Sequence, residues 1–420
     1  MSVALPRMFR LKRRFPRSSV TDVEAEVDAA VGKLASGVKP GARIAVGVGS
    51  RGIANLSVIV ARVVGLLKEA GAKPFVVPAM GSHGGATPEG QIRILADYGV
   101  TETSAGAPIR ASMATRVIGE NSLGRGVAFS VEALEADAVF PINRVKPHTD
   151  FQGGLGSGVV KMLVVGFGKH AGASGFHRSA MQLGYEPALR EAADIILGSA
   201  PVLGGLALVE DAYHQTARIS ALLPDEFIEA EEALQREARE FLPTLPFDEV
   251  DLLIVDRIGK NISGTGMDTN VIGRGVHGYS THFARQAEAG GPVIKRIFVR
   301  ELTPETHGNA IGIGMADFTT ERLVAATDRQ VTGVNSMTAM TLHAAKLPIA
   351  FPSDREALSA AVETLGLESG SGVRVLRIRD TLSLEALEAS EAYLAELAGR
   401  GDVSQESEPE ELEFGPDGNL

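Results

Sequence analysis

Four histidines and one lysine lie in stretches of the sequence where a side chain could carry out acid–base or covalent chemistry. His83 lies in "GSHGG" and His148 lies in "KPHTD". The other three, at or after the end of one glycine-rich stretch, are Lys161, His170 and His177. An imidazole exchanges protons near neutral pH, and basic residues just before His148 would attract an anion. These residues predict an enzyme that acts on a small anion, with paired histidines as acid and base.

The glycine-rich run before Lys161 matches neither common nucleotide-binding motif. A P-loop places its lysine directly after glycine and a hydroxyl residue after the lysine, but Gly158 is followed by "VVKM". The stretch "GVGSRG" also lacks the acidic residue that a dinucleotide-binding unit carries at the end of its next strand. The glycines could line the phosphate of a mononucleotide or simply permit tight turns.

The sequence does not support a metal site built by the protein alone. It contains no cysteine, and no two histidines have the spacing H-x-x-x-H or H-E-x-x-H. One histidine cannot hold a transition metal tightly. A metal in this protein would therefore need a cofactor that supplies most of its ligands.

Composition excludes several classes of protein. The chain of 420 residues is 44% hydrophobic, enough for a large core, and its net charge of −11 disfavours a nucleic-acid partner. It has no tryptophan and only 5% aromatic residues, so a stacking surface for single-stranded nucleic acid is not expected. No apolar run reaches membrane-spanning length without glycine or charge breaks. We expect a soluble cytoplasmic protein with no membrane partner.

Predicted strands and helices alternate along the first half of the chain. Strands are expected at residues 43–50, 73–80 and 137–145, with helices at 55–71 and within 81–99. Glycine-rich junctions follow the strands. This alternation is typical of an α/β fold with a largely parallel sheet.

A second α/β unit is expected to begin near residue 248. The domain prediction assigns 1–247 to an N-terminal α/β domain that carries the lysine and the histidines, and 248–385 to a C-terminal α/β domain. A helix over 386–400 would pack back on either domain, and the acidic stretch 401–420 reads as disordered. The basic start of the chain predicts an edge strand.

The polar motifs follow the ends of predicted strands. "GSRG", "MGSHGG", "NRVKPH" and "DRIGKN" each place a charged or imidazole side chain beside small residues. Ligands of α/β sheets bind at the carboxyl ends of strands. We therefore expect one active site, in the cleft between the two domains.

Taken together, these motifs resemble the nickel-dependent lactate racemase family. "GSRG", "MGSHGGAT", "VKPHTDFQGGLGSGVVKM" and "GFH" occur in that family's order and at similar separations. The resemblance covers residues 40–180 well and the rest loosely. It implies an isomerase with a nickel-pincer cofactor, a pyridinium-3,5-bisthiocarboxylic acid mononucleotide made by separate biosynthetic enzymes.

The resemblance also implies roles for residues near the cofactor. Lys161 matches the lysine that anchors it through a thioamide, and His177 matches the histidine that completes the nickel coordination, with His170 as the alternative. The sulfur and carbon donors of the cofactor explain how a cysteine-free chain could hold nickel. The loop residues that would lie against the cofactor are Gly156, Ser157 and Gly158.

Further matches concern the substrate. His83 and His148 match the two acid–base histidines, Arg51 matches an arginine that would hold the carboxylate, and Lys260 is a weaker candidate for a substrate contact. The implied reaction is racemisation or epimerisation of a 2-hydroxy acid, in which hydride moves to the cofactor and back through a 2-keto acid. With one histidine on each side, the hydroxyl of either enantiomer could be deprotonated.

Two departures from the family pattern concern the substrate pocket. Where lactate racemases carry an acidic residue and a hydroxyl before the arginine, this chain has Gly49 and Ser50, and the loop from His148 to Lys161 is longer. We therefore expect a substrate other than lactate, such as an aromatic, dicarboxylic or sugar acid. Two alternatives are an isomerase or dehydratase that uses its histidines without metal, and a non-catalytic small-anion binding protein.

Overall fold

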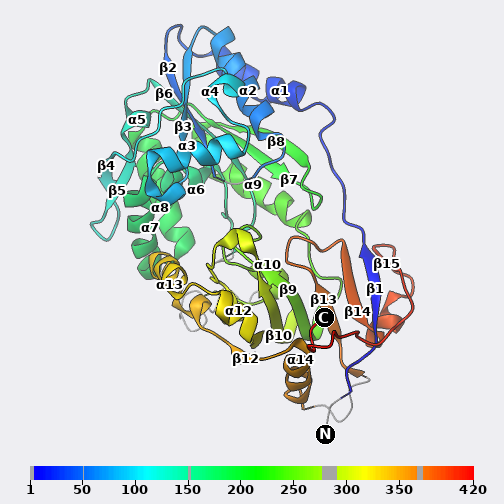
Figure 1. Cartoon of the computed structure of the whole chain (residues 1–420). Coiled ribbons are helices and arrows are strands. Elements are labelled where there is room, and N and C mark those ends of the chain that lie inside the picture. Colours follow the sequence, from blue (N-terminus) through cyan, green and yellow to red (C-terminus); the bar gives the residue numbers. More distant parts are fainter. Residues whose placement is uncertain (1–3, 51, 150–152, 277–290, 367–371) are drawn as a thin grey trace. The chain divides into compact units, whose positions relative to one another are not determined.

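The computed structural model describes residues 4–50, 52–149, 153–276, 291–366 and 372–420. The chain folds into two compact units, each with its own sheet (Figure 1). Unit 1 comprises Met1–Phe15, Thr149–Gln152 and Pro243–Leu420. Unit 2 comprises Pro16–His148 and Gly153–Leu242. The prediction of two α/β domains with largely parallel sheets is confirmed.

Unit 2 contains a five-stranded sheet in the order β3-β2-β6-β7-β8. Its strands are β2 (Arg43–Val48), β3 (Lys73–Pro78), β6 (Ala138–Arg144), β7 (Gly205–Glu210) and β8 (Thr216–Leu222). The first four in spatial order are parallel, and β8 pairs antiparallel with β7. Strands covered on both faces read as continuous apolar runs, which is why β2 is buried along almost its whole length.

Helices cover both faces of this sheet. Those of unit 2 are α1 (Val23–Ser36), α2 (Leu56–Glu69), α3 (Pro88–Asp97), α4 (Glu102–Ala105), α5 (Val131–Leu134), α6 (Val159–Lys161), α7 (Lys169–Leu183), α8 (Tyr185–Ser199) and α9 (Phe227–Glu240). A π-helical segment, η2 (Met162–Gly166), joins α6 to α7 by way of a short turn, and a hairpin is formed by β4 (Thr115–Glu120) and β5 (Gly126–Ser130). Ile44, Val46 and Val48 of β2 share a core with α1 and α2. On the opposite face, the ring of Phe167 occupies the space beside Gly47.

Unit 1 contains an eight-stranded sheet in the order β12-β11-β10-β9-β13-β14-β1-β15. The strands are β1 (Met8–Arg13), β9 (Glu249–Ile258), β10 (Val293–Leu302), β11 (Phe318–Thr320), β12 (Ile349–Phe351), β13 (Val375–Ile378), β14 (Ala386–Ser390) and β15 (Val403–Gln405). From β12 to β13 the pairing is parallel, and from β13 to β15 it is antiparallel. The helices are α10 (Thr269–Ile272), α12 (Glu321–Ala326), α13 (Arg329–Thr338) and α14 (Asp354–Glu363).

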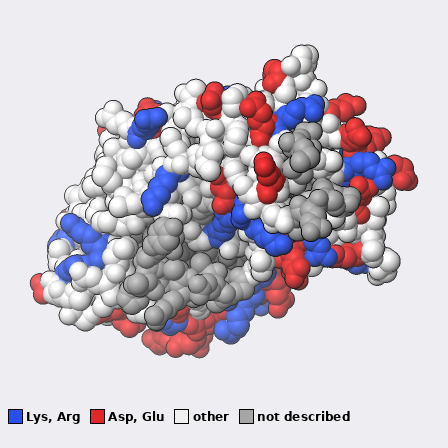
Figure 2. Space-filling model, turned by 90° about the horizontal axis from the view of Figure 1, so that it is seen from below, with Lys and Arg blue, Asp and Glu red and all other residues white. Residues whose placement is uncertain are grey.

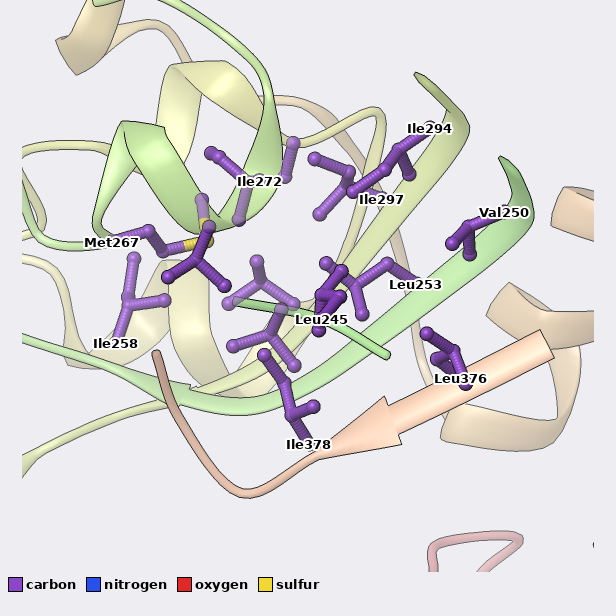
Figure 3. Close-up of a cluster of buried hydrophobic side chains, with 14 of the residues drawn as sticks. Leu245, Val250, Leu253, Ile258, Met267, Ile272, Ile294, Ile297, Leu376 and Ile378 are labelled. Atoms are coloured by element: carbon purple, nitrogen blue, oxygen red, sulfur yellow. The ribbon is translucent and has the colours of Figure 1, made fainter. Parts of the chain in front are cut away.

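The core of unit 1 forms on both faces of β9. In Figure 3, Leu253, Ile297 and Leu376 of three adjacent strands converge with Met267 and Ile272 from the segment after β9. Alternate residues of β9, Leu252 and Ile254, instead belong to the core that contains α14. The period-two alternation of strand side chains thus divides one apolar run between two cores.

The predictions for the start of the chain are wrong in two respects. The start does form a strand, but β1 lies between β14 and β15 in unit 1, so it is neither an edge strand nor part of an N-terminal domain. β1 pairs with a strand on each side, and Leu11 lies opposite Leu387 of β14 and Gln405 of β15. Unit 1 resumes at Pro243, close to the expected boundary at 248.

The helix predicted over 386–400 is also wrong. The segment forms β14 followed by a 3-10 helix, η8 (Glu391–Leu397). Leu387 and Ala389 alternate inward from the sheet, and the Tyr393 ring stacks on Phe247 at 3.9 Å between centroids. Strand pairing on both sides outweighs the helical propensity of an Ala-, Leu- and Glu-rich segment.

The stretch 401–420 is ordered rather than disordered. It forms β15 and a bridge between Met8 and Glu410. Leu412, Phe414 and Leu420 pack against the core that contains α14. Few apolar residues suffice here, because the sheet and arginines of unit 1 provide partners for the backbone and the polar side chains.

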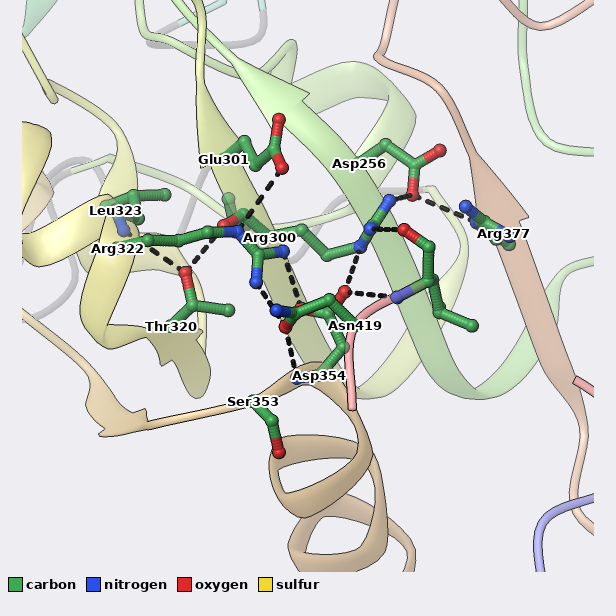
Figure 4. A network of polar contacts seen from close by, with 12 residues as sticks. Asp256, Arg300, Glu301, Thr320, Arg322, Leu323, Ser353, Asp354, Arg377 and Asn419 are labelled. Carbon is green, nitrogen blue, oxygen red and sulfur yellow. Dashed lines mark hydrogen bonds and ion pairs between the residues drawn. The ribbon is translucent and has the colours of Figure 1, made fainter. Parts of the chain in front are cut away.

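A network of buried and half-buried ion pairs holds this stretch in place (Figure 4). Arg300 pairs with Asp256 and Asp354, both at 2.8 Å, and Arg322 pairs with Asp354 at 2.7 Å. The backbone N–H of Leu420 donates to Asp354 at 3.0 Å, and Arg300 donates to the Leu420 carbonyl at 2.5 Å. Asp354 is fully buried, so its charge depends on these partners.

Charged side chains of both signs occur together on one face of the molecule. On the face drawn in Figure 2, Lys and Arg side chains lie among Asp and Glu side chains outside the grey residues. Within the part of the chain that the structure describes, no helix combines the length and the apolar character needed to cross a bilayer.

Replacing Asp354 with asparagine should destabilise unit 1 by about 3–5 kcal/mol, because Arg300 and Arg322 would lose a shared buried counter-charge. Urea unfolding measures the change. The matched control is Glu385→Gln, which removes the exposed partner of Lys12 at 3.9 Å and should cost less than about 1 kcal/mol. Equal effects of the two substitutions would contradict a stabilising role for the network.

Candidate functional site in unit 2

The candidate site lies at the carboxyl edge of the unit 2 sheet, where the strand order reverses. β2 has β3 on one side and β6 on the other, which is the switch point at which open α/β sheets bind ligands. Ser50 follows β2, His83 follows β3 and His148 follows β6. The Ser50 hydroxyl and Nδ1 of His83 are hydrogen-bonded. The fold therefore places the loops after all three strands at one edge.

His148 and Lys161 are in direct contact. Nζ of Lys161 is hydrogen-bonded to Nε2 of His148, and the Tyr185 hydroxyl lies 3.3 Å from the same nitrogen. The imidazole is 8% exposed and packs against the Tyr185 ring, with 4.8 Å between centroids. Nζ of Lys161 lies 5.6 Å from the centroid of that ring. An amine and an imidazole in this contact can exchange a proton directly.

The helix that carries Lys161 is held at its first turn. Asn143, near the end of β6, donates from its side chain to the Gly158 carbonyl at 2.7 Å. Glu231 of α9 accepts from the Val160 N–H at 2.8 Å. Lys161 is the last residue of α6, directly before the π-helical η2. Such π segments recur at functional sites because they change the direction of side chains within a helix.

The glycines before Lys161 are required by packing against α9. A side chain at Gly156 would need the space that the Gln235 amide occupies, and one at Gly158 would meet the Glu231 carboxylate. Ser157 makes a backbone bridge with Lys146, with N–H···O distances of 2.8 and 2.9 Å. The suggested cofactor contacts of Gly156, Ser157 and Gly158 remain a prediction.

His177 is linked to the cluster through aromatic rings. Phe176 lies edge-on to both Tyr185 and His177, at centroid distances of 4.9 and 5.6 Å. His177 is half-buried on α7, whereas His170 is exposed near the start of the same helix. Phe176 and His177 therefore extend the group formed by Lys161, Tyr185 and His148.

The substrate contacts of Arg51 and Lys260 remain predictions. Arg51 lies outside the described residues. Lys260 belongs to unit 1, where it follows β9 and donates to the Gly264 carbonyl at 3.0 Å. Within the described ranges, no group of three or more His, Cys, Asp or Glu side chains could hold a metal ion.

Two residues of the site, Ser50 and Tyr185, were not predicted from the sequence. Ser50 was noted only as a departure from a family pattern, and its bond to His83 depends on the pairing of β2 with β3. Tyr185 begins α8 and matches no motif. Only the packing of α8 beside α7 brings its hydroxyl to His148.

The comparisons with known proteins concern the fold. The structure of the lactate racemase apoprotein from Thermoanaerobacterium thermosaccharolyticum matches with a TM-score of 0.53 and 14% identity, over 87% of this chain and 93% of that chain. No protein-family model matches the chain, and no curated protein matches it either. At this identity the likeness establishes a shared two-unit α/β fold.

Burial raises the pKa of Glu231 to about 7. In the unfolded chain this carboxyl titrates near its ordinary value of 4.5, so between pH 4.5 and 7 the folded state holds the extra proton. The free energy of unfolding therefore falls as pH rises through this window. Glu231→Gln has no carboxyl to titrate, so its free energy of unfolding should not show this fall. The difference in unfolding free energy between variant and parent should therefore shift by about 3 kcal/mol in favour of the variant as pH rises from 4 to 8.

Urea unfolding at several pH values tests this expectation. Glu229→Gln, at an exposed position of the same helix, is the control and should follow the parent across the range. If the free energy of unfolding of Glu231→Gln changes with pH in the same way as that of the parent, the carboxyl of Glu231 does not titrate in this window.

Tyr185→Phe should alter the environment of His148 while leaving the fold intact, because it removes one hydroxyl and costs about 1 kcal/mol. The ¹⁵N imidazole signals of histidine-labelled protein report on Nε2 directly. Tyr213→Phe, whose ring packs on Arg17, is the control and should leave the His148 signals in place. Unchanged His148 signals in both variants would contradict the contact with Tyr185.

Proposed function

We propose that the protein is a racemase or epimerase of a 2-hydroxy acid that works with a nickel-pincer nucleotide tethered to Lys161. The observation that carries this proposal is the contact between Nζ of Lys161 and Nε2 of His148 at the switch point of the unit 2 sheet. It places a primary amine and an acid–base imidazole in direct contact. The shared fold with a lactate racemase apoprotein supports the same reading.

The residues present fit such a cofactor. Lys161 is half-buried, with its amine beside a polar cluster, so it can serve as a covalent anchor. His177 would add one imidazole from the same helical run. Because the chain has no cysteine, soft donors for nickel would come from the cofactor. When bound, the cofactor would supply the hydride acceptor and donor for the C2 hydrogen.

The two strand-end histidines would handle the hydroxyl proton of the substrate. His148 would take it from one enantiomer and His83 from the other, each returning it in the reverse direction. Ser50 orients the His83 ring through Nδ1, and Tyr185 restricts the ring of His148. An imidazole held in one orientation is the more effective base, because proton transfer requires hydrogen-bond geometry.

The loop after β2 favours a substrate other than lactate. A Cβ atom at Gly49 would lie 3.1 Å from the end of the Met162 side chain and 3.4 Å from the amide oxygen of Asn143. A side chain at position 49 would therefore need only a small shift of the flexible end of Met162. Lactate racemases carry an acidic residue where this chain has Gly49, and the absence of that residue after β2 supports a different or larger 2-hydroxy acid.

Protein produced together with the enzymes that make the pincer cofactor should carry a mononucleotide adduct on Lys161, together with nickel. Intact mass measurement and peptide mapping locate the adduct. Lys161→Arg should abolish it, whereas Lys146→Arg, at a nearby lysine, should retain it. An unmodified Lys161 in a host that makes the cofactor would overturn the proposal and favour a metal-free isomerase or dehydratase, or an anion-binding protein.

The same loaded protein identifies the substrate class. Aromatic, dicarboxylic and sugar 2-hydroxy acids should interconvert faster than lactate when each single enantiomer is followed by chiral chromatography. Activity confined to lactate would contradict the argument from Gly49. His148→Gln and His83→Gln should each reduce turnover by at least about a hundredfold, since general acid–base catalysis contributes that much.

A further inference from the structure

Lys169 combines two features that are unfavourable for a lysine. Its side chain is fully buried, and its backbone has a left-handed φ of 55°. Long charged side chains are almost never fully buried without a partner, and non-glycine residues rarely adopt this backbone conformation. The residue stands where the turn after η2 enters α7, between Lys161 and His177. Both features indicate that the contact made by its amine matters to this part of the fold.

The contacts of Lys169 lead to the loop that carries His83. Nζ donates to the carbonyl of Pro78, the last residue of β3, at 2.5 Å. It also donates to the Gln91 side-chain oxygen, a longer contact of 3.4 Å. The fully buried Gln91 amide in turn donates to the carbonyls of Gly81 at 3.0 Å and His83 at 3.4 Å. Lys169 and Gln91 thus contact the loop at its start and its middle.

Backbone contacts bring the same loop against η2. The Gly81 N–H donates to the carbonyl of Gly166 at 3.1 Å. A side chain at Gly166 would meet the carbonyl of Ala79, and a Cβ at Gly81 would lie 3.2 Å from the carbonyl of Val165. The loop therefore approaches the helix too closely for side chains at either glycine.

We propose that Lys169 and Gln91 are positioning residues that tie the His83 loop to the helical run carrying Lys161 and His177. Nζ of Lys169 fixes the end of β3, and the Gln91 amide fixes the turn that presents the imidazole. Neither side chain is proposed to touch substrate. The tie itself is a property of unit 2, whereas its consequence for turnover rests on the proposed function.

Hydrogen–deuterium exchange tests the tie in the full-length protein. Lys169→Met keeps the length of the side chain and removes the donor, and Gln91→Met does the same for the amide. Each should speed exchange of the amides in residues 79–87 by about tenfold, the effect of losing one or two buried hydrogen bonds. Exchange in β2 should stay unchanged. Lys68→Met, at an exposed lysine of α2, is the control and should leave the loop as in the parent.

Non-additivity separates a tie from general loss of stability. Because Lys169 and Gln91 support the same loop, the double variant should exchange little faster there than the faster single variant. The ¹⁵N imidazole signals of His83 should also move in both single variants. Unchanged loop exchange in folded variants, or exchange that rises equally in β2 and β3, would overturn the proposal.

In cofactor-loaded protein, both single variants should lower kcat more than they raise KM. A misplaced base reduces the stabilisation of the transition state more than it reduces the affinity for substrate. Faster loop exchange without any effect on turnover would retain the tie and reject His83 as the base. Turnover that is absent even from the parent would instead count against the proposed function, because the exchange result does not depend on it.

Discussion

The hydrogen bond between Lys161 and His148 is the interaction around which the site of unit 2 is organised. It joins the loop after β6 to the helical run that begins at α6. Asn143 and Glu231 bind the backbone at the first turn of that run, next to Lys161. The packing of α8 beside α7 adds Tyr185, whose ring packs against the imidazole. The loop glycines follow from the same constraint, since the chain must pass close beneath α9 to reach Lys161.

Buried polar groups mark the places where each unit fixes its geometry. In unit 2 these groups are Glu231, which binds the backbone next to Lys161, and Lys169, which binds the start of the His83 loop. In unit 1 the corresponding group is Asp354, which pairs with two arginines. An ionisable group in such a place is costly unless its partners are aligned. Such a group favours one position of the loop over all others, because a displaced loop would leave the group without partners. The segments that depend on them are the two strand-end loops and the stretch 401–420.

The likeness to a lactate racemase apoprotein extends over most of both chains at 14% identity, so what is shared is the framework. A common framework carries different reactions when the strand-end residues differ. Here the histidines after β3 and β6 and the lysine of α6 have the types that the proposed reaction needs. Gly49 and Ser50, after β2, lie beside Met162 and His83.

The amino-acid sequence was enough to predict the α/β class, the alternation of strands and helices in unit 2, the start of a second α/β unit near residue 248, and the position of the polar motifs after strands. These features are local, because apolar periodicity and glycine junctions operate over about ten residues. Tertiary structure alone decided the strand at 386–390, the order of the stretch 401–420 and the placement of β1, because each depends on pairing with distant segments. It also decided the contacts of Tyr185 and Ser50. A side chain's nearest partner is set by how strands and helices pack, and that information is not present in any short stretch of sequence.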